Sequence, residues 1–169
     1  MDAQSHTPGH VASPVVVLDD GTGGLSDRAR AWIADRAAAA IGYLGAAGEV
    51  RVRVVNDSEM SAAHKEFLEI DGTTDVITFD MSEPGPGGSA VLDADLLICL
   101  DEASRQAGAR GHDAERELLL YVVHGVLHCL GYDDHDEEQY AAMHAREDEV
   151  LRAIGVGATF ATEPRGGGA

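Results

Sequence analysis

The hydrophobic positions of the chain follow two different periods, and they predict strands and helices up to about residue 100 and helices alone after it. Short apolar or alternating runs indicate strands, whereas apolar residues three and four apart indicate helices. The expected strands are residues 15–18, 49–56, 74–79 and 96–100. The expected helices are residues 26–44, 58–69, 101–109, 113–130 and 136–154. This pattern predicts one α+β domain, with a small mixed sheet of about four strands packed against about five helices.

The two ends of the chain lack this periodicity. Residues 1–13 and 157–169 are polar and contain glycine and proline, so we expect them to be disordered tails around a domain of residues 14–156. The first residues have neither a charged n-region nor an apolar h-region, and they do not resemble a signal peptide. Residues 83–89, Glu-Pro-Gly-Pro-Gly-Gly-Ser, are typical of a loop.

Charge and cysteine content narrow the class of protein. The 169 residues carry a formal net charge of −18, which disfavours loose binding to nucleic acid, so an RNA partner would need a local basic patch or a docking protein. Cys99 and Cys129 each lie in an apolar segment, as expected for reduced thiols in a cytosolic protein. Because no apolar stretch approaches membrane-spanning length, we expect a cytoplasmic protein with no membrane partner. We expect no DNA partner either.

The segment 124–135, His-Gly-Val-Leu-His-Cys-Leu-Gly-Tyr-Asp-Asp-His, carries the candidate chemistry. His124 and His128 are four residues apart, so on a helix their imidazoles project from one face. Gly131 suits the positive φ angle with which a helix commonly ends, and the returning chain can deliver His135 as a third ligand. Three imidazoles with an open position for water are typical of a catalytic zinc site. Gly125 stands where His-Glu-x-x-His zinc proteases have their general base.

Several motifs together resemble the YbeY family, bacterial rRNA maturation factors described as zinc-dependent endoribonucleases. The histidine segment 124–133 resembles the family signature His-Gly-x-Leu-His-x-x-Gly-Tyr-Asp. Residues 74–79, Thr-Asp-Val-Ile-Thr-Phe, resemble a second motif, and residues 94–98, Ala-Asp-Leu-Leu-Ile, a third. Glu117 and Leu118 match the Glu-Leu pair that opens the family's histidine helix. The matches are in the family's order and span about residues 50–152.

The chain departs from the family pattern at two positions. The family places its third histidine directly after the Asp of the signature, where this chain has Asp134 followed by His135. Either a one-residue bulge lets His135 bind zinc, which we favour, or Asp134 binds through a carboxylate oxygen. Leu68 occupies a position where the family commonly has an arginine, and Lys65, one turn earlier, is a possible substitute as a point charge.

The resemblance implies a single-strand-specific endoribonuclease with one Zn²⁺ per chain, acting in rRNA maturation and ribosome quality control. The implied partners are rRNA and a ribosomal subunit or ribosomal protein. The expected zinc ligands are His124, His128 and His135, and we expect His124 to be catalytic as well. Asp75 and Asp95 are candidates to orient the imidazoles. Two alternatives remain: a metzincin-like metallopeptidase, and a non-catalytic assembly factor with a structural zinc that binds a basic ribosomal protein.

Overall fold

The computed structural model describes residues 13–84, 87 and 90–161, and these form the expected single α+β domain. The strands are β1 (Val15–Asp20), β2 (Ala47–Val55), β3 (Val76–Asp80), β4 (Glu83–Pro84) and β5 (Ala90–Cys99). The helices are α1 (Asp27–Tyr43), α2 (Asp57–Leu68), α3 (Leu100–Arg110), α4 (Ala114–Cys129) and α5 (Glu137–Ala153). The α+β class and the five helices are confirmed, and the sheet has five strands where about four were expected.

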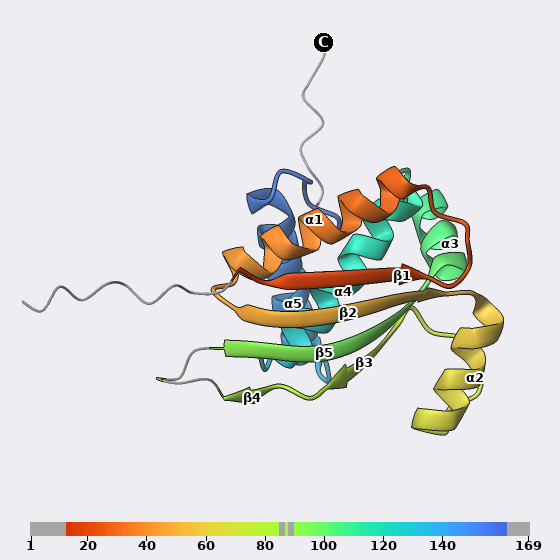
Figure 1. Ribbon diagram of the computed structural model, residues 1–169, viewed down its shortest axis with the longest axis horizontal. Helices are drawn as coiled ribbons and strands as arrows, with labels where there is room; N and C mark the ends of the chain where they lie inside the picture. Colours follow the sequence, from red (N-terminus) through yellow and green to blue (C-terminus); the bar gives the residue numbers. More distant parts are fainter. Residues whose placement is uncertain (1–12, 85–86, 88–89, 162–169) are drawn as a thin grey trace, which may run out of the picture.

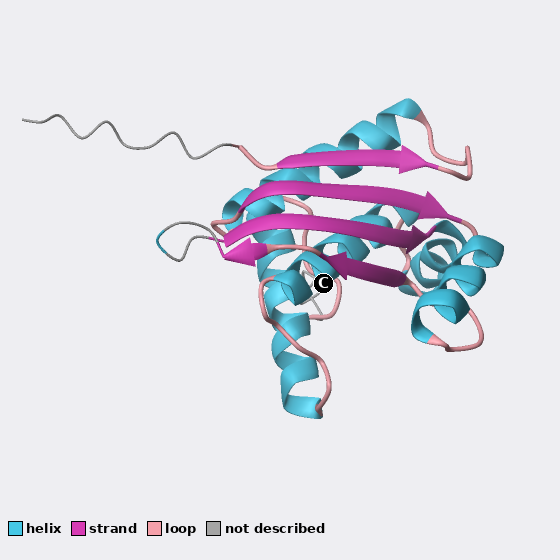
Figure 2. Cartoon of the chain, turned by 60° about the horizontal axis from the view of Figure 1, so that its bottom comes forward, coloured by secondary structure: helices cyan, strands magenta, loops and turns pink. Residues whose placement is uncertain are grey.

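The sheet is mixed, with the order β1-β2-β5-β3 and the short β4 paired to β5. β1, β2 and β5 run parallel, so that Val52 of β2 lies opposite Leu96 of β5. β3 and β4 are antiparallel to β5. Figure 2 shows the short arrow of β3 pointing against the three long parallel strands.

The sequence pattern did not predict the short strand β4 or the first half of β5. β5 begins at Ala90, whereas the sequence pattern predicts a start at residue 96. The pattern misses the first half of β5 because Asp93 and Asp95 interrupt its apolar residues. Both aspartates bond the guanidinium of Arg51 on β2, and this pairing lets acidic residues occupy a strand. β4 lies in the segment expected as a loop, at a strand edge where Pro84 is tolerated.

One face of the sheet is covered by α1, α4 and α5, which lie together on the same side in Figure 1. The valines at 50, 52 and 54 of β2 point into this face and are buried. Arg51 and Arg53 alternate with them and point to the other face, where they form ion pairs with aspartates of neighbouring strands. The core therefore lies between the sheet and these helices.

Helix α4 runs through the middle of this core. Asp113 caps its N-terminus by accepting a hydrogen bond from the Arg116 N–H. Gly125 lets the helix approach the sheet closely, since a Cβ there would lie 2.8 Å from a Leu96 methyl carbon and 3.0 Å from the Thr78 hydroxyl oxygen. The helix ends before Gly131, whose φ of +96° confirms the expected left-handed residue. None of the described helices is long and apolar enough to cross a membrane.

The chain beyond α5 is fixed where a tail was expected. Asp148 is buried in α5, and its carboxylate accepts the backbone N–H groups of Thr159, Phe160 and Ala161 at 2.7, 3.0 and 2.7 Å. Arg116 donates to the Ala158 carbonyl oxygen at 2.8 Å. Residues 157–161 are thus held against α4 and α5. The remaining expected tail residues, 1–12 and 162–169, lie outside the described residues.

Candidate metal centre

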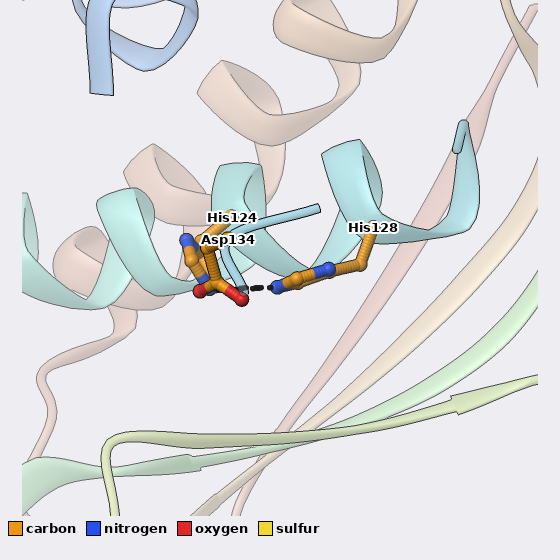
Figure 3. A group of neighbouring side chains, drawn as sticks. All are labelled: His124, His128 and Asp134. Atoms are coloured by element: carbon orange, nitrogen blue, oxygen red, sulfur yellow. Dashed lines mark hydrogen bonds and ion pairs between the residues drawn. The ribbon is translucent and has the colours of Figure 1, made fainter. Parts of the chain in front are cut away.

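His124 and His128 project from one face of α4, as their spacing predicts, and their Nε2 atoms are 3.0 Å apart. The third residue of this group is Asp134, from the loop between α4 and α5. Its Oδ2 lies 3.6 Å from the Nε2 of His124 and 3.7 Å from that of His128. Figure 3 shows the three side chains converging on one point beside the helix.

The opposite nitrogen of each ring is occupied by an oxygen acceptor. His124 Nδ1 lies 2.6 Å from Oε1 of Glu147, and His128 Nδ1 lies 3.1 Å from the Tyr132 carbonyl oxygen. An ionised carboxylate and a carbonyl have no proton to give, so both Nδ1 atoms are the donors. This assignment leaves a lone pair on each Nε2, and both lone pairs point toward Asp134.

The donor set and its spacing fit a divalent metal ion. Ligand atoms at 2.0–2.2 Å from a tetrahedral zinc are separated by about 3.3–3.6 Å, close to the distances among the two imidazoles and the carboxylate. Two neutral imidazoles and one carboxylate are also a ligand set that zinc accepts, with one position left for water. Imidazoles whose distal N–H groups bond oxygen acceptors are the usual arrangement around such an ion.

His135 does not join the pair. Its side chain is 82% exposed, and its Nε2 lies 3.0 Å from Oδ1 of Asp133. It belongs instead to a second acidic group with Asp133 and Asp134. After the turn at Gly131, it is the Asp134 carboxylate, and not the His135 ring, that lies beside the two imidazoles.

Glu147 on α5 is the functional residue that sequence reasoning missed. It is 1% exposed, and its second oxygen accepts a hydrogen bond from His144 Nδ1 at 2.9 Å, so one carboxylate orients two imidazoles. Burial lowers the pKa of His124, but the hydrogen bond to Glu147 and the charges of Glu147, Asp75 and Asp134 together raise this pKa by more. A signal was present in the sequence: residue 147 falls on the apolar stripe of the helix, where an acidic side chain must have a partner.

The two aspartates expected to orient the imidazoles have other contacts. Asp95 accepts a hydrogen bond from Arg51 on the open face of the sheet. Asp75 accepts the backbone N–H of Val76, although its side chain does border the metal centre. Cys129, next to His128, has its pKa raised to about 12 by burial and by Asp80, and is therefore a neutral thiol and no nucleophile at neutral pH.

Two cavities flank His124, and both include Asp75 in their walls. The first, of about 440 Å³, lies toward α3 and α5 and is lined by residues that include Arg110, Tyr121, His144 and Phe160. The second, of about 580 Å³, lies toward α2 and β3 and includes Leu68 and His128. Lys65, considered as a substitute cation, is mostly exposed, pairs with Asp71 and lines neither cavity. A ligand could therefore extend from one cavity to the other across the two histidines.

The fold and this site define a small α+β protein with a candidate metal centre of two helical histidines and one carboxylate, open to cavities on both sides. A family model described as "Endoribonuclease YbeY" matches residues 24–155, and the chain belongs to this family. The curated Endoribonuclease YbeY of Pelotomaculum thermopropionicum is 38% identical over 139 residues, which cover 80% of this chain and 88% of that protein.

One further relative agrees with this assignment, and one solved structure has the same fold. The Endoribonuclease YbeY of Renibacterium salmoninarum is 40% identical over 117 residues, 66% of this chain and 74% of the relative. The solution structure of TM1509 from Thermotoga maritima has the same fold, with a TM-score of 0.56 at 21% sequence identity. It covers 89% of this chain and 99% of the other.

Proposed function

We propose that the protein is a zinc-dependent endoribonuclease specific for single-stranded RNA, acting in the cytoplasm in rRNA maturation and ribosome quality control. The observation that carries the proposal is the convergence of the two Nε2 atoms and the Asp134 carboxylate between two cavities, in a chain that belongs to the Endoribonuclease YbeY family. Its partners would be rRNA and a ribosomal subunit or ribosomal protein.

The proposed zinc ligands are His124, His128 and Asp134, with one ion per chain. A zinc ion bound there would neutralise charge that develops on a phosphoryl group and would acidify a water molecule. Glu147 holds the His124 ring in the ligating tautomer, and the Tyr132 carbonyl does the same for His128. These contacts fix the site before substrate arrives, which is the main contribution of a protein to such a centre.

The metallopeptidase alternative has less support. The general base of a His-Glu-x-x-His peptidase follows the first histidine directly, and this position is Gly125. The Cα–Cβ direction at Gly125 points into the sheet, toward Leu96 and Thr78, and away from the metal centre. A glutamate could not fit there without moving α4. A peptidase general base would therefore have to be supplied by another helix, strand or loop.

The experiment compares cleavage of a single-stranded RNA by wild type, H124A, D134A, H135A and H64A proteins that are prepared identically, with zinc content measured for each. His64 is outside the site and bonds the Gly72 carbonyl, so H64A is the matched control. We expect H124A and D134A to lose cleavage and most of their zinc, and H135A and H64A to retain both.

Each other outcome has a distinct meaning. Loss of zinc in H135A with retention in D134A would make His135 the third ligand, as the sequence favoured. Equal cleavage by wild type and H124A would indicate a contaminating nuclease. If the wild type binds zinc but does not cleave RNA, the hypothesis of a non-catalytic assembly factor replaces that of an enzyme.

A further inference from the structure

Arg110, at the end of α3, is the only lysine or arginine among the described residues that lines either cavity beside His124. Its side chain is 31% exposed, so a ligand can reach it. The wall of the other cavity carries Leu68 and no such cation. One permanent positive charge therefore stands beside the metal centre, on one side only.

Two contacts hold the Arg110 guanidinium in place. Its Nη1 donates to Oε1 of Glu117 at 2.7 Å, and this glutamate is completely buried in the first turn of α4. The guanidinium carbon also lies 5.0 Å from the centre of the Phe160 ring, within cation–π range. No other hydrogen bond joins this guanidinium to a described residue. Its remaining N–H donors are thus available while its position is fixed.

The charges around the cavity favour an anion at Arg110 over an anion elsewhere on the wall. Three carboxylates of the wall already have donors: Glu147 bonds two histidines, Glu102 bonds Arg105 and Gln106, and Asp75 bonds a backbone N–H. The fourth, Asp134, is a proposed zinc ligand. The whole chain carries a net charge of −18 and repels polyanions at long range. Binding of RNA therefore depends on local cations, and a guanidinium with free donors suits a phosphate.

We infer that Arg110 forms a phosphate subsite for the RNA substrate, one nucleotide or more away from the phosphate that reacts. The inference rests on the proposed function and deepens it. Glu117, which holds Arg110, precedes His124 by seven residues on α4, which is about 10.5 Å along a helix axis. Arg110 is thus bonded about two helical turns before the proposed zinc ligand His124, and we place it on a neighbouring phosphate and not on the one that reacts. Arg110 therefore anchors the strand and does not touch the reacting group.

This position predicts a particular kinetic signature. An interaction with a phosphate that does not react is equally strong in the ground state and the transition state, so its loss raises KM and leaves kcat unchanged. We expect R110Q to raise KM for a short single-stranded RNA by about tenfold, with kcat within twofold of wild type. The glutamine amide can still donate to Glu117, so the buried carboxylate keeps a partner.

Binding provides a second readout that does not require turnover. Fluorescence anisotropy of a labelled single-stranded RNA gives the dependence of log K on log salt concentration, whose slope falls in magnitude by about 0.7 for each lost phosphate contact on a single strand. R110Q should show this decrease. R105Q is the matched control, because Arg105 lies on the same helix but lines neither cavity, and its replacement removes the same charge.

The outcomes separate this subsite from the proposed function. If R110Q is folded and its KM and salt slope equal those of R105Q while wild type cleaves RNA, the subsite is wrong and the function stands. If wild type binds RNA through Arg110 without cleaving it, the subsite stands and the enzyme is wrong. If R110Q does not fold, the same measurements are made on R110K, which keeps the charge but loses the planar guanidinium. A higher KM with an unchanged salt slope supports the subsite, and an unchanged KM overturns it.

Discussion

Two buried carboxylates bond side chains that line the same cavity, and their different bonding shows two uses of a buried charge. Glu117 and Glu147 are both almost fully buried, and each bonds two basic side chains. Glu147 uses both oxygens, one for each imidazole. Glu117 uses Oε1 for both Arg110 and His112, and its Oε2 has no partner among the described residues.

The difference follows from what each carboxylate holds. Glu147 satisfies its lone pairs by fixing the orientation of two rings, which a proposed metal ligand such as His124 requires. Glu117 keeps an unused acceptor next to Tyr121. The Tyr121 hydroxyl likewise has no hydrogen-bond partner within the described part of the chain, and its pKa is raised by burial and by the charge of Glu117. Its main effect is to hold a permanent cation at the cavity. The carboxylate at the start of α4 therefore holds a positive charge, that of Arg110, whereas the carboxylate that bonds His124 fixes the orientation of imidazole rings.

The largest effect is expected for E147A. Removal of this carboxylate frees the His124 ring and leaves His144 without its acceptor, so zinc affinity should fall by 10–100-fold. Competition with a zinc-chelating dye measures the change. E149A is the control, since Glu149 lies on the same helix, is exposed, and bonds Tyr43 and Arg146 away from the site. Equal zinc affinities of E147A and wild type would show that the His124 imidazole binds zinc equally well without the hydrogen bond to Glu147.

A smaller and different effect is expected for E117Q. The amide keeps one acceptor for Arg110 and His112 but loses the charge, so the free energy of unfolding should fall by about 1 kcal/mol. Zinc affinity should not change, because Glu117 does not contact the ligands. Urea unfolding and the same dye competition measure both quantities, with E115Q in the same helical turn as control. A loss of zinc affinity in E117Q would remove the distinction between the two carboxylates.

The sequence predicted the fold where one period dominated a long segment. The helix that carries His124 and His128 was predicted over residues 113–130 with its end near Gly131, because residue spacing and helix ends are local features. The start of β5 was missed because its acidic residues are neutralised by Arg51, a contact made across the sheet. Such a contact cannot be inferred from the order of residues along one strand.

The site was predicted only in the part that one helix determines. The histidine pair follows from four-residue spacing, whereas the choice between Asp134 and His135 depends on the path of a loop. Glu147 comes from another helix, and its partnership with His124 is made by the packing of α5 on α4. The fixed residues 157–161 likewise depend on Asp148, an acidic residue whose partners are backbone N–H groups distant in sequence.

The smallest effect is expected for H144Q, which tests whether the two bonds of Glu147 act separately. The glutamine amide can replace the Nδ1 donor, and Glu147 keeps its bond to His124, so zinc affinity should fall by less than tenfold. The stacking of His144 on Phe160, at 3.7 Å between ring centres, is lost as well, and the RNA KM should rise slightly because Phe160 supports Arg110. Dye competition and RNA kinetics measure the two changes, with H64Q as control. If H144Q loses as much zinc affinity as E147A, the carboxylate and both imidazoles form one cooperative unit, and the His124 bond alone does not hold the ring.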